Sequence, residues 1–187
     1  MIVPVEVSAR HVHLSEADFR ALFGHGELHV LRELSQPGQF AARECVTLLH
    51  DGKTLKDVRL VGPFRGETQV ELAPTDARAL GYEHLPLKDK HESTGGASIT
   101  VVGPKSSLRR HGAFYSKRHL HCDPQSAKDL GRVDGDEVRV RIQGARGLIL
   151  EHVIVRVRGD YRLRLHLDTD EGNAAGLKGG EHAVVVQ

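Results

Sequence analysis

The sequence predicts a mainly β protein in which short strands close into small barrels and helices are few and short. Three observations support this fold class. Many segments are rich in β-branched residues or alternate between apolar and polar residues, as half-buried strands do. Turn sequences such as Asp51-Gly52 and Asp134-Gly135 separate these segments at short intervals. A histidine motif also occurs twice along the chain, which indicates two related halves.

The predicted strands follow one another along most of the chain. Their short length and regular spacing favour closed sheets over a βαβ arrangement. Two polar segments, Lys88–Ala97 and the basic Pro104–Gly112, are predicted to be loops. The predicted strands are Val3–Ser8, Cys45–His50, Val58–Val61, Gln69–Leu72, Ser98–Val102, Glu137–Gln143, Gly147–Val157, Tyr161–Leu167 and Ala183–Gln187.

Start and stop signals mark a small number of helices. Residues Ser15–Asp18 resemble a capping box, and the helix that they begin would stop near Gly24. The segment Pro74–Gly81 has a start signal and a glycine stop. In Asp123–Gly131 an N-cap aspartate precedes a proline, and a glycine follows the last turn. One further helical turn is predicted at Asn173–Leu177.

Composition excludes several classes of function. Lys plus Arg is 26 and Asp plus Glu is 25, so the net charge of +1 attracts neither nucleic acid nor an anionic membrane. No apolar run approaches the roughly 20 residues of a membrane span, and the N-terminus lacks a signal peptide. The two cysteines, Cys45 and Cys122, form no CxxC pair and fit the reducing cytoplasm. Dinucleotide-binding, P-loop, nucleophile-elbow and HExxH motifs do not occur.

Histidine is unusually frequent, at 13 of 187 residues, and imidazole serves both metal binding and proton transfer. The repeated motif is Arg10–His13 (RHVH) and Arg118–His121 (RHLH). Alternate residues of a strand share a face, so the two histidines of each pair can converge on one ion. A single pair would also fit a solvated strand face, but the repetition favours a metal site. A second echo, Val61-Gly62-Pro63 and Val102-Gly103-Pro104, points to the same two halves.

Four other residues are candidates for the site. His166 lies in an apolar strand before an acidic cluster, and it is either a buried hydrogen-bonded residue or a ligand. Glu71 is either a carboxylate ligand or part of a solvated strand face. Arg65 follows a Gly-Pro turn, where a guanidinium can bind an oxyanion through two hydrogen bonds. Cys122 is a soft ligand, a nucleophile or a buried filler, and alternation favours the filler because it points away from the histidines.

Five segments in order resemble one known family. The chain from about Pro4 to its C-terminus closely resembles the PduL-type phosphate propanoyltransferases, also called phosphotransacylases, in VSARHVHLS, GQFAARECVTL, VGPFRGETQVEL, RHLHCDPQSAKDLG and LHLDTDEGNAAGLKGGE. The resemblance implies two six-stranded β-barrels capped by short helices, with the active site between them. One barrel would comprise residues 1–14 and about 113–187, and the other about 15–112.

The resemblance also implies a site and a reaction. The family transfers an acetyl or propanoyl group reversibly between coenzyme A (CoA) and inorganic phosphate, giving an acyl phosphate. The cofactors would be two divalent metal ions, usually zinc, and Arg65 would be the catalytic residue that binds phosphate. We expect phosphate to attack the thioester directly, without a covalent acyl-enzyme. One metal would be held by His11, His13 and Glu71, and the other by His119, His121 and His166.

This sequence departs from the family pattern at three positions near the site. Cys122 replaces a common Met, Gly172 a usual Ala, and Arg164 a common acidic residue. None is a proposed ligand, so the departures bear on acyl preference and on the surroundings of the metals. Members that work inside bacterial microcompartments often carry an N-terminal targeting helix. This chain starts ten residues before His11, so we expect a cytoplasmic enzyme of acetate, propanoate or propanediol metabolism without a shell partner.

Two other classes of function share these features. A metal-dependent hydrolase of thioesters or phosphoesters would use water in place of phosphate. A non-catalytic metal-binding β-barrel module would bind zinc without turnover. The sequence alone does not identify the residues that contact CoA, because the basic segment Lys105–Arg110 is either a contact for CoA phosphates or a solvated hairpin. A homo-oligomer is compatible with the sequence.

Overall fold

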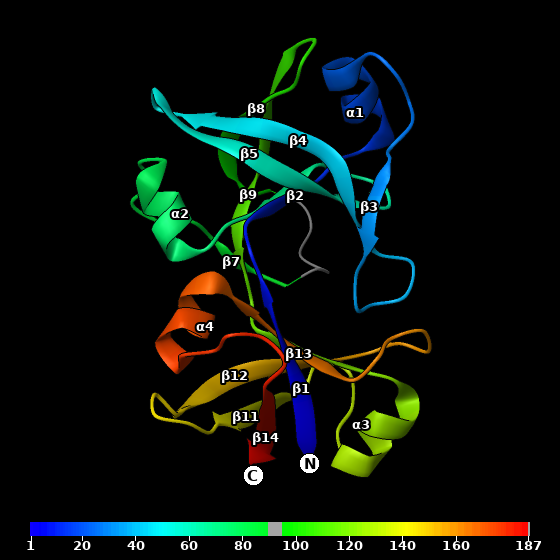
Figure 1. Cartoon of the computed structure of the whole chain (residues 1–187), viewed down its shortest axis with the longest axis vertical. Coiled ribbons are helices and arrows are strands. Elements are labelled where there is room, and N and C mark those ends of the chain that lie inside the picture. The colour runs from blue at the N-terminus through cyan, green and yellow to red at the C-terminus, as the bar shows by residue number, and fades with distance from the viewer. Residues whose placement is uncertain (90–94, 187) are drawn as a thin grey trace. The chain divides into compact units, whose positions relative to one another are not determined.

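The computed structural model describes residues 1–89 and 95–186, and the chain divides into two compact units (Figure 1). The first unit contains Met1–Ala9 and Lys117–Gln187, and the second contains Arg10–Ser116. The chain therefore changes unit just before each Arg-His-x-His motif. Residues 10–14 and 113–116, which the family resemblance places in the first barrel, fall in the second unit.

The strands of the first unit close into a barrel. They are β1 (Ile2–Ser8), β10 (His119–Cys122), β11 (Glu137–Ile142), β12 (Leu148–Val157), β13 (Arg164–Asp168) and β14 (His182–Val186). Their order around the barrel is β1-β13-β10-β12-β11-β14. Two short helices, α3 (Pro124–Leu130) and α4 (Thr169–Ala175), lie at opposite sides of these strands (Figure 1).

The second unit also contains a closed ring of strands. Its strands are β2 (His11–His13), β3 (Val30–Glu33), β4 (Phe40–His50), β5 (Lys53–Gly62), β6 (Gln69–Glu71), β7 (Leu87–Lys88), β8 (Ala97–Val102) and β9 (Ser107–Ser116), and its helices are α1 (Glu16–Phe23) and α2 (Pro74–Ala79). The ring runs β4-β5-β2-β6-β9-β8 and closes because β8 pairs with both β9 and β4. β3 pairs with β4 and β7 with β9, outside the ring. The predicted mainly β fold with two small barrels and short helices is confirmed.

The two barrels share one arrangement of strands. In the second unit, β2 runs parallel to β5 and antiparallel to β6, and β6 runs parallel to β9. In the first unit, β10 likewise runs parallel to β12 and antiparallel to β13, and β13 runs parallel to β1. A short helix follows β2 and β10, and another follows β6 and β13. The predicted repeat is therefore structural, and each repeat contributes its first strand, β1 or β9, to the barrel built from the other repeat.

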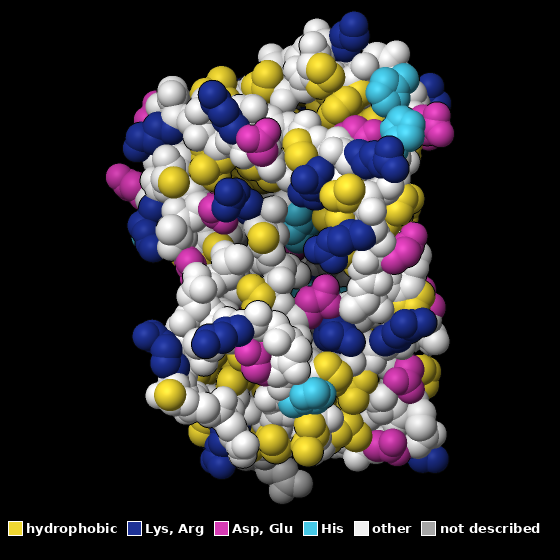
Figure 2. Space-filling model, viewed as in Figure 1, with side chains coloured by type: hydrophobic (Ala, Val, Ile, Leu, Met, Phe, Trp, Pro, Cys, Tyr) yellow, Lys and Arg dark blue, Asp and Glu magenta, His cyan; other side chains and the backbone are white. Residues whose placement is uncertain are grey.

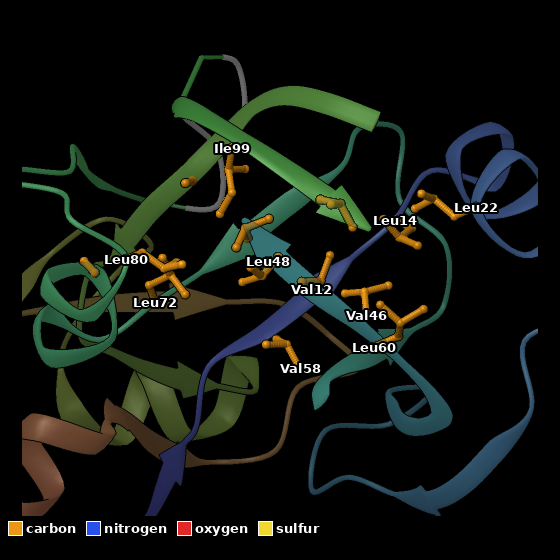
Figure 3. Close-up of a cluster of buried hydrophobic side chains, with 14 of the residues drawn as sticks. Val12, Leu14, Leu22, Val46, Leu48, Val58, Leu60, Leu72, Leu80 and Ile99 are labelled. Carbon is orange, nitrogen blue, oxygen red and sulfur yellow. The ribbon is translucent and has the colours of Figure 1, made fainter. Parts of the chain in front are cut away.

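Alternation along the short central strands separates the histidines from the cores. Val12, between the two histidines of β2, is fully buried in the core of the second unit with Leu60 and Val70. Figure 3 shows Val12 in this core together with Val46, Leu48 and Leu60. Leu120 occupies the same place in the first unit. Both histidine pairs consequently lie on the outer faces of the barrels.

Cys122 lies in the same core as Leu120. Its side chain is fully buried among apolar residues of the first unit, and burial raises the pKa of the thiol to about 12. The interpretation of Cys122 as a buried filler is therefore confirmed.

The start and stop signals lie at the observed helix ends, but only one half of the capping box predicted at Ser15–Asp18 forms, because the Asp18 carboxylate accepts from Thr68 and Arg110 instead. The side chain of Ser15 accepts a hydrogen bond from the backbone N–H of Asp18, and α1 ends at Gly24 in the left-handed conformation. Asp123 caps α3 in the same way. The helical turn predicted at Asn173–Leu177 is the end of a longer helix, α4, because Asp168 and Glu171 form a capping box that starts the helix at Thr169.

Two loop predictions change in the structure. The segment Pro104–Gly112 is wrong as a loop, because β9 begins at Ser107 and forms a hairpin with β8. Arg110 on this strand pairs with Asp18, so the hairpin interpretation of Lys105–Arg110 is favoured over a CoA contact. In the predicted loop Lys88–Ala97, β7 includes Lys88 and β8 starts at Ala97, and residues 90–94 lie outside the described residues.

The Val-Gly-Pro echo is wrong as a sign of the repeat. Both copies lie in the second unit, at the ends of β5 and β8, which are not equivalent strands. Each glycine is instead required by a close approach. A Cβ at Gly62 would overlap the Phe40 ring, and a Cβ at Gly103 would lie 2.6 Å from the Leu22 carbonyl oxygen.

Charged side chains of both signs cover the face of the protein shown in Figure 2. Lys and Arg stand among Asp, Glu and hydrophobic side chains there, as the net charge of +1 implies. Within residues 1–89 and 95–186, no helix has the length and apolar character needed to cross a membrane.

Candidate metal centres

The two His-x-His pairs occupy equivalent positions in the two barrels. On β2 and β6, His11 lies directly opposite Glu71. On β10 and β13, His119 lies directly opposite His166. Opposite residues of neighbouring strands share a face of the sheet, so each pair receives a third side chain. Among the described residues, this forms two groups whose ligand atoms all lie within 4.8 Å of one another: His11, His13 and Glu71, and His119, His121 and His166.

The first group has the dimensions of a zinc site. The Nε2 atoms of His11 and His13 are 3.2 Å apart. Oε1 of Glu71 lies 3.7 Å from the Nε2 atom of His11 and 3.8 Å from that of His13. In the plane of these three ligand atoms, the point equidistant from them lies about 2.1 Å from each atom, which is the length of Zn–N and Zn–O bonds. The residues present therefore fit a zinc-sized ion where they stand.

A hydrogen bond at Nδ1 of His13 leaves the lone pair of its Nε2 atom available to a metal ion. Its Nδ1 atom donates to the carbonyl oxygen of Val61 at 2.8 Å. Burial is the main cause that holds the pKa of His13 well below its ordinary value, and the charges of Arg65 and His11 lower it further. The ring is therefore neutral, with its proton on Nδ1 and its lone pair on Nε2. Such a carbonyl partner is typical of metal-bound histidine.

The second group consists of three imidazoles and shows the same preparation. The ring centroid of His119 lies 4.7 Å from that of His121 and 5.1 Å from that of His166. Nδ1 of His119 donates to the carbonyl oxygen of Lys117 at 2.8 Å, and burial lowers the pKa of this ring well below its ordinary value. Its Nε2 atom consequently carries the lone pair. Three imidazole ligands suit zinc and other late divalent transition metals.

Arg65 stands at the edge of the first group. Its backbone N–H donates to the carbonyl oxygen of Leu14, which holds the residue against the end of the β2 strand. Its guanidinium donates to the side-chain oxygen of Gln69 and lies 3.9 Å from Oε1 of Glu71. About a third of this side chain is exposed. The arrangement places a cationic fork beside the three ligand atoms, with access to solvent.

Three side chains around the second group were missed from the sequence. Arg156 is only 5% exposed and lies opposite His121 across β10 and β12. The ring of Tyr161 lies 4.2 Å from the ring of His121. Oε2 of Glu6 lies 4.0 Å from Nε2 of His166. A usable signal existed for Glu6 and Arg156, because each is the one charge within an apolar run, residues 2–7 and 153–157.

Fold and ligand groups together define a class of protein: a pair of β-barrels, each with a candidate metal centre on its outer face. The family model of phosphate propanoyltransferase matches residues 4–178.

Known proteins are similar over nearly the whole chain. The phosphate propanoyltransferase of Thermotoga maritima is 44% identical over 186 residues, which cover 98% of this chain and 88% of the relative. That of Shewanella putrefaciens is 42% identical and covers 96% and 85%, and that of Salmonella typhimurium is 44% identical and covers 93% and 83%. The chain therefore belongs to the phosphate propanoyltransferase family, a family of transferases, which confirms the resemblance seen in the sequence.

Proposed function

We propose that this protein transfers a short acyl group, acetyl or propanoyl, reversibly between CoA and inorganic phosphate. Family membership supports the reaction type. The observation that carries the proposal is the guanidinium of Arg65 beside the ligand atoms of the first group, because it puts an anion-binding fork next to a candidate metal site.

The two groups of ligands are proposed to hold one divalent ion each, most suitably zinc. His11, His13 and Glu71 would hold the first ion, and His119, His121 and His166 the second. When bound, the ions would neutralise the charge of phosphate and CoA and polarise the thioester carbonyl. With three protein ligands in each group, a tetrahedral ion keeps one position for substrate.

Arg65 is proposed to bind and orient the phosphate. Gln69 accepts a hydrogen bond from its guanidinium, which limits the rotation of the fork. A guanidinium can donate two parallel hydrogen bonds to two phosphate oxygens. Holding the phosphate in line with the thioester carbonyl should lower the activation barrier by about several kcal/mol, as positioning of reactants does in other enzymes.

The reaction is proposed to be a direct displacement. A phosphate oxygen forms a bond to the carbonyl carbon, the carbon–sulfur bond breaks, and its electron pair leaves on the CoA sulfur as a thiolate. Cys122 supports this view by its position, because the thiol next to the second histidine pair is buried in the core and has a pKa of about 12. Such a thiol is a poor nucleophile at neutral pH.

The test is CoA release from acetyl-, propanoyl- and butanoyl-CoA, with and without phosphate. We expect release to require phosphate and to yield the acyl phosphate. Arg65→Ala should raise the KM for phosphate at least tenfold, whereas Arg32→Ala, which removes an exposed guanidinium of the same unit, should leave it unchanged. Release without phosphate would support a hydrolase instead, and zinc binding without turnover would support a non-catalytic module.

The two cysteines bear on the proposed location. Cys45 and Cys122 are both free thiols in the structure. Free thiols fit a reducing compartment, so we propose that the protein works in the cytoplasm. Its partners there would be acyl-CoA, CoA, phosphate and acyl phosphate.

A further inference from the structure

The arginine of each Arg-His-x-His motif pairs with an acidic residue on a helix of its own unit. Nη1 of Arg10 lies 3.0 Å from Oδ1 of Asp76 on α2. Nε of Arg118 lies 2.7 Å from Oε1 of Glu171 on α4. The reaction proposed above assigns no part to these four residues, yet the pairing occurs in both repeats.

The two ion pairs occupy equivalent places. Asp76 is five residues after Glu71, and Glu171 is five residues after His166. Each acidic residue is the third residue of the helix that follows the strand of the third ligand. Each arginine immediately precedes the first histidine ligand. In both units, the ion pair therefore joins the strand that carries two ligands to the segment that carries the third.

The second ion pair is anchored at both ends. The backbone N–H of Asp168 donates to the other oxygen of Glu171, at 3.0 Å, as part of the capping box of α4. Nη1 of Arg118 also donates to the carbonyl oxygen of Glu151 on β12, at 3.1 Å. Glu171 is consequently fixed to the start of its helix, and Arg118 is fixed both to β12 and to α4, the helix that follows β13.

Such anchoring matters because the ligand strands are very short. β2 has three residues and β10 has four, and the first residue of each is a ligand. A short strand has few ladder hydrogen bonds to hold its end in place. Without a metal, no ion draws the ligand side chains to one point, so a ligand at a strand end keeps its place only as far as contacts within the protein hold it.

We propose that Arg10 and Arg118 are positioning residues that preform the two metal centres. Each arginine–carboxylate pair holds the first histidine of its motif opposite the third ligand before metal binds. The inference rests on the proposed metal centres, and it predicts that each pair acts on one centre only.

Metal affinity tests this role without using the reaction. Zinc affinity would be measured by competition with a chromophoric chelator, and the geometry by the visible absorption of the cobalt-substituted protein. Arg118→Gln should weaken one of two zinc ions by about 10- to 100-fold, the usual effect of removing an outer partner of a ligand. Arg118→Lys, which keeps one charged donor, should weaken it less. Arg139→Gln is the matched control, because it breaks an exposed ion pair of the same barrel.

The same experiment on the second unit should affect the other ion. Arg10→Gln should weaken the centre of His11, His13 and Glu71, with Arg20→Gln as its control, since Arg20 forms an exposed pair with Glu16. Asp76 is buried, so Arg10→Lys is included to retain a partner for its carboxylate if the Gln variant fails to fold. Far-UV circular dichroism and urea unfolding of the metal-free proteins establish that each variant is folded.

Two outcomes overturn the inference. Folded Arg118 and Arg10 variants that bind both ions with wild-type affinity would show that the pairs have no positioning role. Equal weakening of both ions by one variant would point to a general loss of structure. A wild-type protein that binds no zinc would instead contradict the proposed function itself, so the two failures are distinguishable.

Discussion

Acidification from pH 7.5 to 5.5 should destabilise the metal-free protein through His13 and His119. Both rings are almost fully buried, at 2% and 8% exposure, and burial holds the pKa of each well below its ordinary value. In the unfolded chain a histidine binds its proton near pH 6.5. Below that pH the unfolded state therefore binds more protons than the folded state, and the free energy of unfolding falls as the pH falls.

The size of the effect follows from the linkage. For one histidine with an unfolded pKa of about 6.5 and a much lower folded pKa, the loss is roughly 1 kcal/mol at pH 5.5 and nearly zero at pH 7.5. His13 and His119 together should thus remove about 2–3 kcal/mol. The loss begins near pH 6.5 and grows as the pH falls, and the interval from pH 7.5 to 5.5 lies above the range where ordinary carboxylates titrate.

Urea unfolding of the chelator-treated protein at the two pH values measures this loss. His13→Gln and His119→Gln should each reduce the difference between pH 7.5 and 5.5 by roughly 1 kcal/mol. Burial raises the pKa values of Asp168 and Glu171, which acts in the opposite direction, but their contribution cancels when variant and wild type are compared. An equal pH-dependent difference in wild type and both variants would refute the conclusion that these rings are held neutral.

Three substitutions test other parts of the structure. Cys122→Ala should lower the free energy of unfolding, measured with urea, by about 1 kcal/mol. Because the thiol is a buried core group, the same change should leave kcat for phosphate-dependent CoA release within about threefold of wild type. A loss of kcat beyond about 100-fold would contradict direct displacement. Leu48→Ala should lower the free energy of unfolding by about 2–5 kcal/mol, since this side chain is fully buried in the core of Figure 3, and a loss below about 1 kcal/mol would show a loosely packed core. Gly103→Ala should destabilise the protein by about 1–3 kcal/mol and so lower the midpoint of thermal unfolding by several degrees. The reason is that the new Cβ would lie 2.6 Å from the Leu22 carbonyl oxygen. An unchanged midpoint would contradict the close approach.

Local signals in the sequence were sufficient for most elements and for the two histidine pairs. Capping residues such as Ser15 and Asp123 act within one helical turn, so neighbouring residues alone define them. The alternation of His11, Val12 and His13 is equally local, and it correctly separates the ligand face from the core.

Long-range pairing was harder to predict. Glu71 and His166 meet their histidine pairs through strand register, and both lie tens of residues away in the chain. The residues alone left each with two interpretations, and only the family resemblance chose between them. The ion pairs of Arg10 and Arg118 also depend on register. The repeated arginine was visible in the sequence, and so was an acidic residue five positions after both Glu71 and His166.

Strands with polar surroundings escaped the pattern. β3 is exposed at all four of its positions, so no alternation marks it. β9 carries consecutive basic residues that indicated a loop, but Arg109 and Arg110 are bound by Ser98 and Asp18. Their partners come from distant segments, and the sequence gives no local sign of them.

Metal content per chain tests the central proposal most directly. Zinc would be counted by mass spectrometry in the wild-type protein and in His11→Ala and His119→Ala, with phosphate-dependent CoA release measured on the same samples. We expect two zinc ions in the wild type, one in each variant, and activity lost in both variants. Two ions in either variant, or full activity with both centres emptied, would contradict the proposal that the two groups are metal centres on which acyl transfer depends.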